Sequence, residues 1–214
     1  MNQPARILHV LGGVSLGGAE SRIMDLYRCM DRDEIQFDFL VHSDDLNARK
    51  PEFYDEEIKA LGGRIFVLPR FKVYNYIAYK KAVEDFFKNH REFVLVQGHM
   101  TSTAALYLPV AKKAGVPIVA AHARSAGVDK GIKGIITRCL RIPLLKRADY
   151  CLACSKEAGE AVFGKKWEKS GKAVVLPNAI ASEKYIFNRD EREKIREELG
   201  IQESYVIGHV GRFH

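Results

Sequence analysis

The stretch that decides the fold is Ile7-Leu8-His9-Val10-Leu11, followed by Gly12-Gly13-Val14-Ser15-Leu16-Gly17-Gly18-Ala19-Glu20. The first five residues are apolar on both faces, which is typical of a strand buried inside a parallel sheet. Beyond the glycines, apolar side chains recur at helical spacing and predict one apolar helix face, made of Ile23, Leu26, Tyr27 and Met30. The chain therefore begins as a strand, a glycine-rich loop and a helix.

The glycine-rich loop is a candidate anion site. Its four glycines, Gly12, Gly13, Gly17 and Gly18, allow a sharp turn and the close approach of a ligand. A helix that starts in such a loop offers free N–H groups and the positive end of its dipole, so phosphate is the natural ligand. The spacing matches neither the dinucleotide fingerprint nor a P-loop. A plain strand-to-helix connection without a ligand is the alternative.

The composition is that of a globular domain. The chain has 214 residues, of which 47% are hydrophobic and 29% charged, enough for one sizeable core. No apolar run reaches the roughly 18 residues that span a bilayer, and the N-terminus leads into a strand rather than a signal peptide. We expect a cytoplasmic protein, with peripheral contact at the inner face of the cell membrane left open. The net charge of +7 favours an anionic partner, whether nucleotide phosphate, nucleic acid or an acidic membrane surface.

Predicted strands alternate with helices along most of the chain. After the first strand, we predict strands at 35–42, 64–68, 93–97, 116–121, 149–155 and 173–176. This alternation is typical of an α/β fold with a Rossmann-like parallel sheet covered by helices on both faces. We predict that residues 1–180 form this domain. Residues 181–202 are expected to be a linker with an exposed helix at 189–198, and 203–214 to hold the first strand, at 205–210, of a truncated second domain.

Two basic segments are candidates for contact with an anionic partner. Residues 70–81 interleave bases with aromatics; because no nucleic-acid-binding motif occurs, we favour a helix with a basic, partly aromatic outer face. Residues 130–147 form the most basic amphipathic stretch, which Pro143 should bend or break. Such a helix can lie on an anionic bilayer, or it can cover the sheet with its bases in water. The sequence leaves both readings open.

Several polar residues follow predicted strands. Ligands of open parallel sheets collect beyond the carboxyl ends of the strands, where His99, His122 and Asn178 are predicted to lie. His9 and His209 fall inside predicted strands, where a hydrogen-bonded core histidine is the preferred interpretation. The histidines lack metal-ligand spacing, and the cysteines of Cys151-Leu152-Ala153-Cys154 would point to opposite faces of a strand. We therefore expect no metal site.

Together these motifs resemble the retaining, nucleotide-sugar-dependent glycosyltransferases of family 4, whose GT-B fold has two Rossmann-like domains. The matching pieces are the glycine loop with Ala19-Glu20, the strand ending in His122, Leu176-Pro177-Asn178-Ala179, and Val210-Gly211-Arg212. The sequence is similar in particular to bacterial exopolysaccharide and capsule assembly enzymes.

The resemblance implies roles for individual residues. Gly12, Gly13, Gly17 and Gly18 would lie beside the donor diphosphate, and Arg212 would neutralise that diphosphate as it leaves. His122 would be the catalytic residue that hydrogen-bonds the transferred sugar. His99 and Asn178 are candidate contacts for the acceptor or the sugar. Ala179 stands where the family usually has glycine, which puts the following turn in doubt.

We therefore expect the N-terminal, acceptor-side part of a metal-independent retaining glycosyltransferase of polysaccharide biosynthesis, inactive when alone. A nucleotide-diphosphate sugar would be the co-substrate, without a further cofactor, and the acceptor would be a saccharide or a lipid-linked molecule. One alternative is a nicotinamide-dependent oxidoreductase domain, although His42-Ser43 stands where an acidic ribose ligand is needed. The other is a noncatalytic module that binds an anionic polymer or membrane through the two basic segments.

Overall fold

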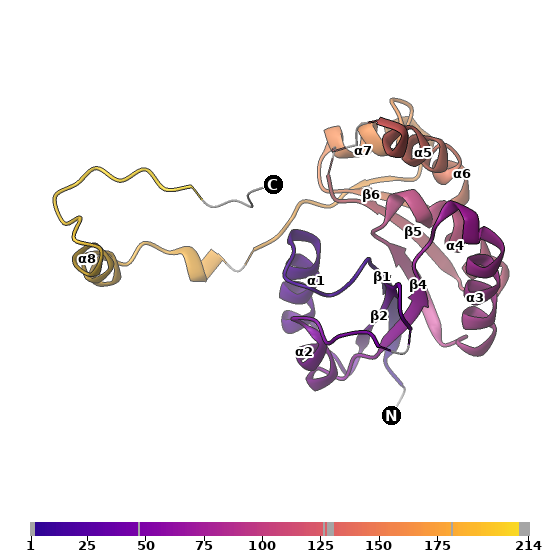
Figure 1. Ribbon diagram of the computed structural model, residues 1–214, viewed down its shortest axis with the longest axis horizontal. Coiled ribbons are helices and arrows are strands. Elements are labelled where there is room, and N and C mark those ends of the chain that lie inside the picture. The colour runs from indigo at the N-terminus through magenta and orange to yellow at the C-terminus, as the bar shows by residue number, and fades with distance from the viewer. Residues whose placement is uncertain (1–2, 47, 126, 128–130, 181, 210–214) are drawn as a thin grey trace. The chain divides into compact units, whose positions relative to one another are not determined.

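The computed structural model in Figure 1 describes residues 3–46, 48–125, 127, 131–180 and 182–209. The backbone divides into two compact units, Met1–Ala179 and Ile180–His214.

The first unit is built on a seven-stranded sheet. Its strands are β1 (Ala5–Val10), β2 (Ile35–Ser43), β3 (Ile65–Pro69), β4 (Phe93–Gly98), β5 (Ile118–Ala123), β6 (Tyr150–Ala153) and β7 (Ala173–Val175). Its α-helices are α1 (Gly18–Cys29), α2 (Asp55–Ala60), α3 (Tyr76–Asn89), α4 (Thr101–Lys113), α5 (Gly131–Arg141), α6 (Leu144–Arg147) and α7 (Lys156–Phe163). Short 3-10 turns are η1 (Val73–Asn75) and η2 (Glu168–Ser170).

All strand pairs are parallel, in the order β3-β2-β1-β4-β5-β6-β7. From β1 the chain builds outward to β3, and from β4 it builds outward in the opposite direction to β7. The strand order therefore reverses between β1 and β4. In open parallel sheets, this reversal point opens a crevice at the carboxyl ends of the strands, where ligands bind.

The strands bury side chains on both faces, in two separate cores. Along β2, Phe37, Phe39 and Val41 pack on one side with α1 and α2, whereas Leu40 packs on the other with α3 and α4. The helices α6 and α7 add to the second core. Figure 1 shows α1 and α2 on one side of the sheet and α3 and α4 on the other. This confirms the predicted Rossmann-like sheet with helices on both faces.

The face that carries α1 and α2 is covered unevenly. Ile118 on β5, Tyr150 on β6 and Val174 on β7 lie on this face, and they are 39%, 47% and 38% exposed. The described helices on this side thus cover the strands from β1 to β3 and leave the other half of the face open. A concave site can form at the border between the two halves.

Most predicted elements are present, and Pro143 separates α5 from α6 as expected. Helix α7 was not predicted, because its eight residues carry only a short apolar repeat. Strand β5 extends through His122 to Ala123, so His122 lies inside the strand rather than at its end.

The second unit holds η3 (Ser182–Tyr185) and α8 (Arg189–Glu198), the exposed helix predicted for this region. The Asn188 side chain caps α8 by accepting from the Glu191 N–H at 3.1 Å. The strand predicted at 205–210 is not present over residues 205–209. A strand needs a neighbouring strand for its hydrogen bonds, and the described residues offer none to this segment. Throughout the described ranges, no helix is both long and apolar enough to cross a membrane.

Candidate functional site

The glycine loop joins β1 to α1 at the reversal point of the sheet. None of its four glycines, Gly12, Gly13, Gly17 and Gly18, has a positive φ angle. The backbone conformation therefore does not require glycine at these positions. At Gly13 an added Cβ would lie 2.6 Å from a carboxylate oxygen of Glu52, so the end of the Glu52 side chain would have to move. An added Cβ at Gly12 would instead meet only the Met100 sulfur, at 3.9 Å.

The loop is fixed by the segment that precedes α2. The Val14 N–H donates to the Glu52 carboxylate, and the Tyr54 N–H donates to the Val14 carbonyl at 3.1 Å. Arg49 pairs with Glu52 at 3.2 Å. A carboxylate therefore already occupies one amide of the predicted anion site. At the N-terminus of α1, the N-cap residue Gly17 has no side chain to cap the first N–H groups, and the Glu20 carboxylate lies against this position.

Three histidines from adjacent strands meet beside this loop. His9 lies on β1, His99 directly follows β4, and His122 lies on β5. The His99 N–H donates to the Val10 carbonyl at 3.0 Å, which ties the end of β4 to the start of the loop. The Nδ1 atom of His9 lies 3.0 Å from Nε2 of His99, and the rings of His99 and His122 are 5.4 Å apart. We call these three residues the histidine cluster.

Arg124 connects the histidine cluster to the last segment of the unit. Its Nε donates to Nδ1 of His99 at 3.3 Å, and its Nη1 donates to Oδ1 of Asn178 at 3.2 Å. The structure thus brings together His99, His122 and Asn178, which the sequence analysis expected at one edge of the sheet. The sequence analysis missed Arg124, although a base directly after the fifth strand was a usable signal, because charged groups at the carboxyl ends of parallel strands face the crevice.

These contacts fix the hydrogens of two imidazoles. Arginine can only donate, so Nδ1 of His99 accepts and neutral His99 carries its hydrogen on Nε2. His99 then donates to Nδ1 of His9, and neutral His9 must carry its own hydrogen on Nε2. That Nε2 atom is buried and has no hydrogen-bond partner in the described part of the chain. The interpretation of His9 as a hydrogen-bonded core histidine is therefore correct for Nδ1 and wrong for Nε2.

His122 is in a similar position. The amide nitrogen of Gln97 lies 2.8 Å from Nδ1 of His122. When the amide donates, His122 carries its hydrogen on Nε2, which is also buried without a partner among the described atoms. A buried donor without a partner costs about 1–3 kcal/mol, so a ligand or water that accepts from these N–H groups is strongly favoured.

Burial keeps the histidine cluster neutral. Burial, together with the nearby Arg124 guanidinium, lowers the pKa of His9 and of His122 from 6.5 to about 3. It also holds the pKa of His99 well below its usual range. At neutral pH these imidazoles can donate hydrogen bonds but carry no charge. The positive charge beside them belongs to Arg124, whose own pKa burial lowers.

A cavity of about 260 Å³ lies against the cluster. Its polar lining comes from His9, Arg22, Gln97, His122, Arg124 and Asn178, and its apolar lining includes Ile7, Ile23 and Phe37. This volume is just below the roughly 300–1,000 Å³ of sites for drug-sized ligands. A few converging polar groups in a largely apolar hollow are typical of small-molecule sites.

The remaining predicted residues lie elsewhere. His209 is exposed rather than a core residue, because the segment that holds it forms no strand. Arg212 lies outside the described residues. Among the side chains that the structure describes, no group of three or more His, Cys, Asp or Glu could hold a metal ion.

Comparison with known proteins places this geometry in context. The sequence profile of Glycosyltransferase Family 4 matches residues 16–184. EpsF of Bacillus subtilis (strain 168), which its name classes provisionally as a glycosyltransferase, is 33% identical over 213 residues, covering 98% of this chain and 54% of EpsF. The chain thus spans about half the length of this curated relative.

Solved structures share the fold. Anabaena HepE, crystallised with UDP and glucose, superposes with a TM-score of 0.66 at 15% identity, over 98% of this chain and 54% of HepE. A UDP-glucosyltransferase from Polygonum tinctorium superposes with a TM-score of 0.55 at 12% identity, over 92% of this chain and 57% of that protein. At these identities the likeness concerns the fold.

Proposed function

The chain belongs to Glycosyltransferase Family 4, and from this premise we propose that it is the N-terminal, acceptor-side part of an enzyme that transfers a sugar from a nucleotide-diphosphate sugar. The proposed acceptor is a saccharide or a lipid-linked molecule, and the proposed process is polysaccharide biosynthesis, as in exopolysaccharide assembly. Retention of configuration and independence from metal ions are parts of the proposal that rest on the family resemblance. The family assignment replaces the oxidoreductase alternative.

The observation that carries the proposal is that His9 and His122 both line the cavity and that the buried Nε2 atom of each has no hydrogen-bond partner among the described atoms. Sugar hydroxyls are good acceptors for such N–H donors. A neutral imidazole can bind a hydroxyl in this way without adding a positive charge to the site. HepE, which shares the fold, was crystallised with UDP and glucose, which supports a nucleotide sugar as the proposed ligand.

In this proposal the groups around the cavity have different roles. His122 and His9 would donate to hydroxyls of the transferred sugar, while Arg124 holds His99 in the tautomer that orients His9. The amides at the start of α1 would face the diphosphate, whose negative charge grows as the sugar departs. Glu52 occupies the Val14 amide, so the diphosphate would bind at the α1 end of the loop rather than at Val14.

The test uses the full polypeptide that the gene encodes, a panel of nucleotide sugars and NMR detection of the released nucleotide. We expect turnover with at least one donor. His122→Ala should reduce the rate by about 10²–10³, the usual cost of removing one preorganised donor. His90→Gln is the matched control, because His90 is a half-buried histidine outside the cluster and pairs with Glu92.

Two results would contradict the proposal. The first is the absence of both binding and turnover with every nucleotide sugar in a correctly folded protein. The second is transfer by His122→Ala at the unaltered rate, which would remove His122 from the catalytic site.

A further inference from the structure

Helix α5 turns its apolar stripe toward solvent. Ile132, Ile135 and Ile136 are 79%, 60% and 39% exposed, and Cys139 on the same stripe is exposed as well. These residues follow the i, i+3, i+4, i+7 spacing that in a surface helix normally faces the core. Gly134, on the opposite side of the helix, is buried instead. The helix is thus inverted relative to an ordinary covering helix.

A second exposed apolar segment adjoins this stripe. A cavity of about 570 Å³ is lined by Ile132 and Ile136 on α5 and by Phe71 and Val73 before α3. Val73 is itself 64% exposed. We call Val73, Ile132, Ile135 and Ile136 the apolar surface. Tyr74 and Ile77, which continue the chain from Val73, are 84% and 82% exposed.

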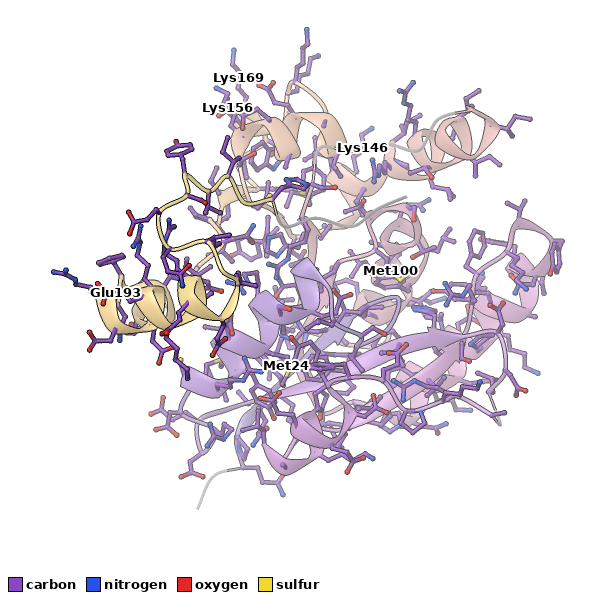
Figure 2. All side chains as sticks on the ribbon, turned by 60° about the vertical axis from the view of Figure 1, so that its left-hand side comes forward. Met24, Met100, Lys146, Lys156, Lys169 and Glu193 are labelled. Carbon is purple, nitrogen blue, oxygen red and sulfur yellow. The ribbon has the colours of Figure 1, made fainter. Side chains whose placement is uncertain are left out.

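The segments that form the apolar surface are strongly basic. Residues 70–81 contain four Lys or Arg and no acid, and residues 130–148 contain six and no acid. Arg70 and Lys72 share one carboxylate, Asp44, at 3.2 and 2.8 Å, so this group keeps a net positive charge. Lys146 of α6 is labelled in Figure 2.

We propose that the apolar surface docks on an anionic lipid bilayer, with the isoleucines in the interface and the surrounding bases against lipid phosphates. Exposed isoleucines beside lysine, arginine and tyrosine are the composition of helices that lie in a membrane interface. A second copy of this chain is a poorer partner, because it would bring two basic surfaces together. Single exposed apolar residues are common on protein surfaces, but the apolar surface is a group of neighbouring side chains, and such groups mark interaction sites.

The location of the surface gives docking a consequence. Met100, Ser102 and Thr103 at the start of α4 line the same cavity, and Met100 directly follows His99 of the histidine cluster. Docking would therefore place the bilayer next to the edge of the sheet that holds the candidate site. If the proposed function is correct, a lipid-linked acceptor could enter the site from the membrane.

Sedimentation with vesicles tests the proposal without any sugar chemistry. We expect the protein to bind vesicles that contain phosphatidylglycerol, to bind pure phosphatidylcholine much more weakly, and to lose binding in high salt. The double variant Ile132→Ser with Ile135→Ser should lower the partition coefficient about tenfold or more, because two exposed isoleucines no longer enter the interface. Phe53→Ser, at a side chain that is 66% exposed near α2, is the apolar control.

A charge test complements the apolar one. Arg138→Glu on α5 should weaken binding to phosphatidylglycerol vesicles several-fold, whereas Lys165→Glu, exposed after α7, should change it less. Unfolding midpoints of all variants should match the parent, since every altered side chain is exposed.

Equal binding by the double variant and the parent, or no binding by the parent, would overturn the proposal. So would dimerisation that the isoleucine substitutions abolish in the absence of vesicle binding, because a second copy would then cover the surface. Since no nucleotide sugar is present, failure here leaves the transfer proposal standing, and failure of transfer leaves vesicle binding unaffected.

Discussion

Helices α1 and α5 have similar apolar stripes, but most of the α1 stripe is buried and most of the α5 stripe is exposed. On α1, Ile23, Met24 and Tyr27 are at most 2% exposed, whereas Leu26 of the predicted stripe is 54% exposed. Figure 2 labels Met24 on this helix. On α5, Ile132 and Ile135 are mostly exposed. Sequence periodicity thus indicates that a stripe exists but not which way it faces.

The difference follows from what lies beneath each helix. Helix α1 directly follows β1 and returns to β2 beside it, so the right-handed crossover lays its stripe on the sheet. Helix α5 packs instead against the neighbouring helices α4, α6 and α7. Its buried Gly134 presents no side chain to that contact, and the isoleucines remain outside.

Removing one buried side chain of α1 gives the largest expected effect on this comparison. Tyr27 is fully buried, and its hydroxyl hydrogen-bonds Gln36 at 2.5 Å. Tyr27→Ala should lower the free energy of unfolding by about 3–5 kcal/mol. Ile132→Ala should change it by less than about 0.5 kcal/mol. Urea unfolding of both variants measures the contrast, and equal losses would show that the α5 stripe is also part of the core.

Acid should weaken the core beside α1 before it affects the surface around α5. The pKa of both His9 and His122 is about 3 in the folded chain, against 6.5 normally. The unfolded chain therefore takes up protons below pH 6.5 that the folded chain does not. Stability should be full above pH 6.5 and fall as the pH drops toward 3, with about 2 kcal/mol lost per histidine between pH 7 and pH 5.

The pH effect has a direct check. Unfolding free energies measured at several pH values should show a shallower slope for His9→Gln than for the parent, because one buried neutral imidazole is removed. A slope that His9→Gln leaves unchanged would mean that the pKa of His9 is the same in the folded and the unfolded chain.

Arg124 gives the smallest expected change. Arg124→Lys should lose the hydrogen bonds to His99 and Asn178, at a cost of about 1 kcal/mol. The informative readout is ¹⁵N NMR of the imidazoles, in which the hydrogen of His99 should no longer be confined to Nε2. An unchanged spectrum would show that Arg124 does not set the tautomer. Lys172, whose amine bonds the Ala148 carbonyl far from the histidines, offers a control through Lys172→Arg.

The sequence predicted the parallel sheet because each strand carries its own local pattern of apolar residues between turns. It predicted the neighbourhood of His99 and His122 because strand ends of a parallel sheet share one edge. It could not predict that Glu52 would reach the glycine loop, since that contact spans 38 residues and depends on tertiary packing. Nor could the sequence predict that Nε2 of His9 lacks a hydrogen-bond partner among the described atoms. That atom carries the hydrogen of His9 because Arg124 fixes the tautomer of His99, and these contacts depend on the tertiary fold.

Two native cysteines allow the most direct test of the central claim that α1 faces the core while the α5 stripe faces a membrane. Cys29 ends α1, Cys139 lies on the α5 stripe, and both are exposed. Maleimide labelling of the unaltered protein, followed by mass spectrometry of peptides, gives both rates in one sample. We predict that phosphatidylglycerol vesicles slow the labelling of Cys139 and leave that of Cys29 unchanged. Equal rates at Cys139 with and without vesicles would contradict the account.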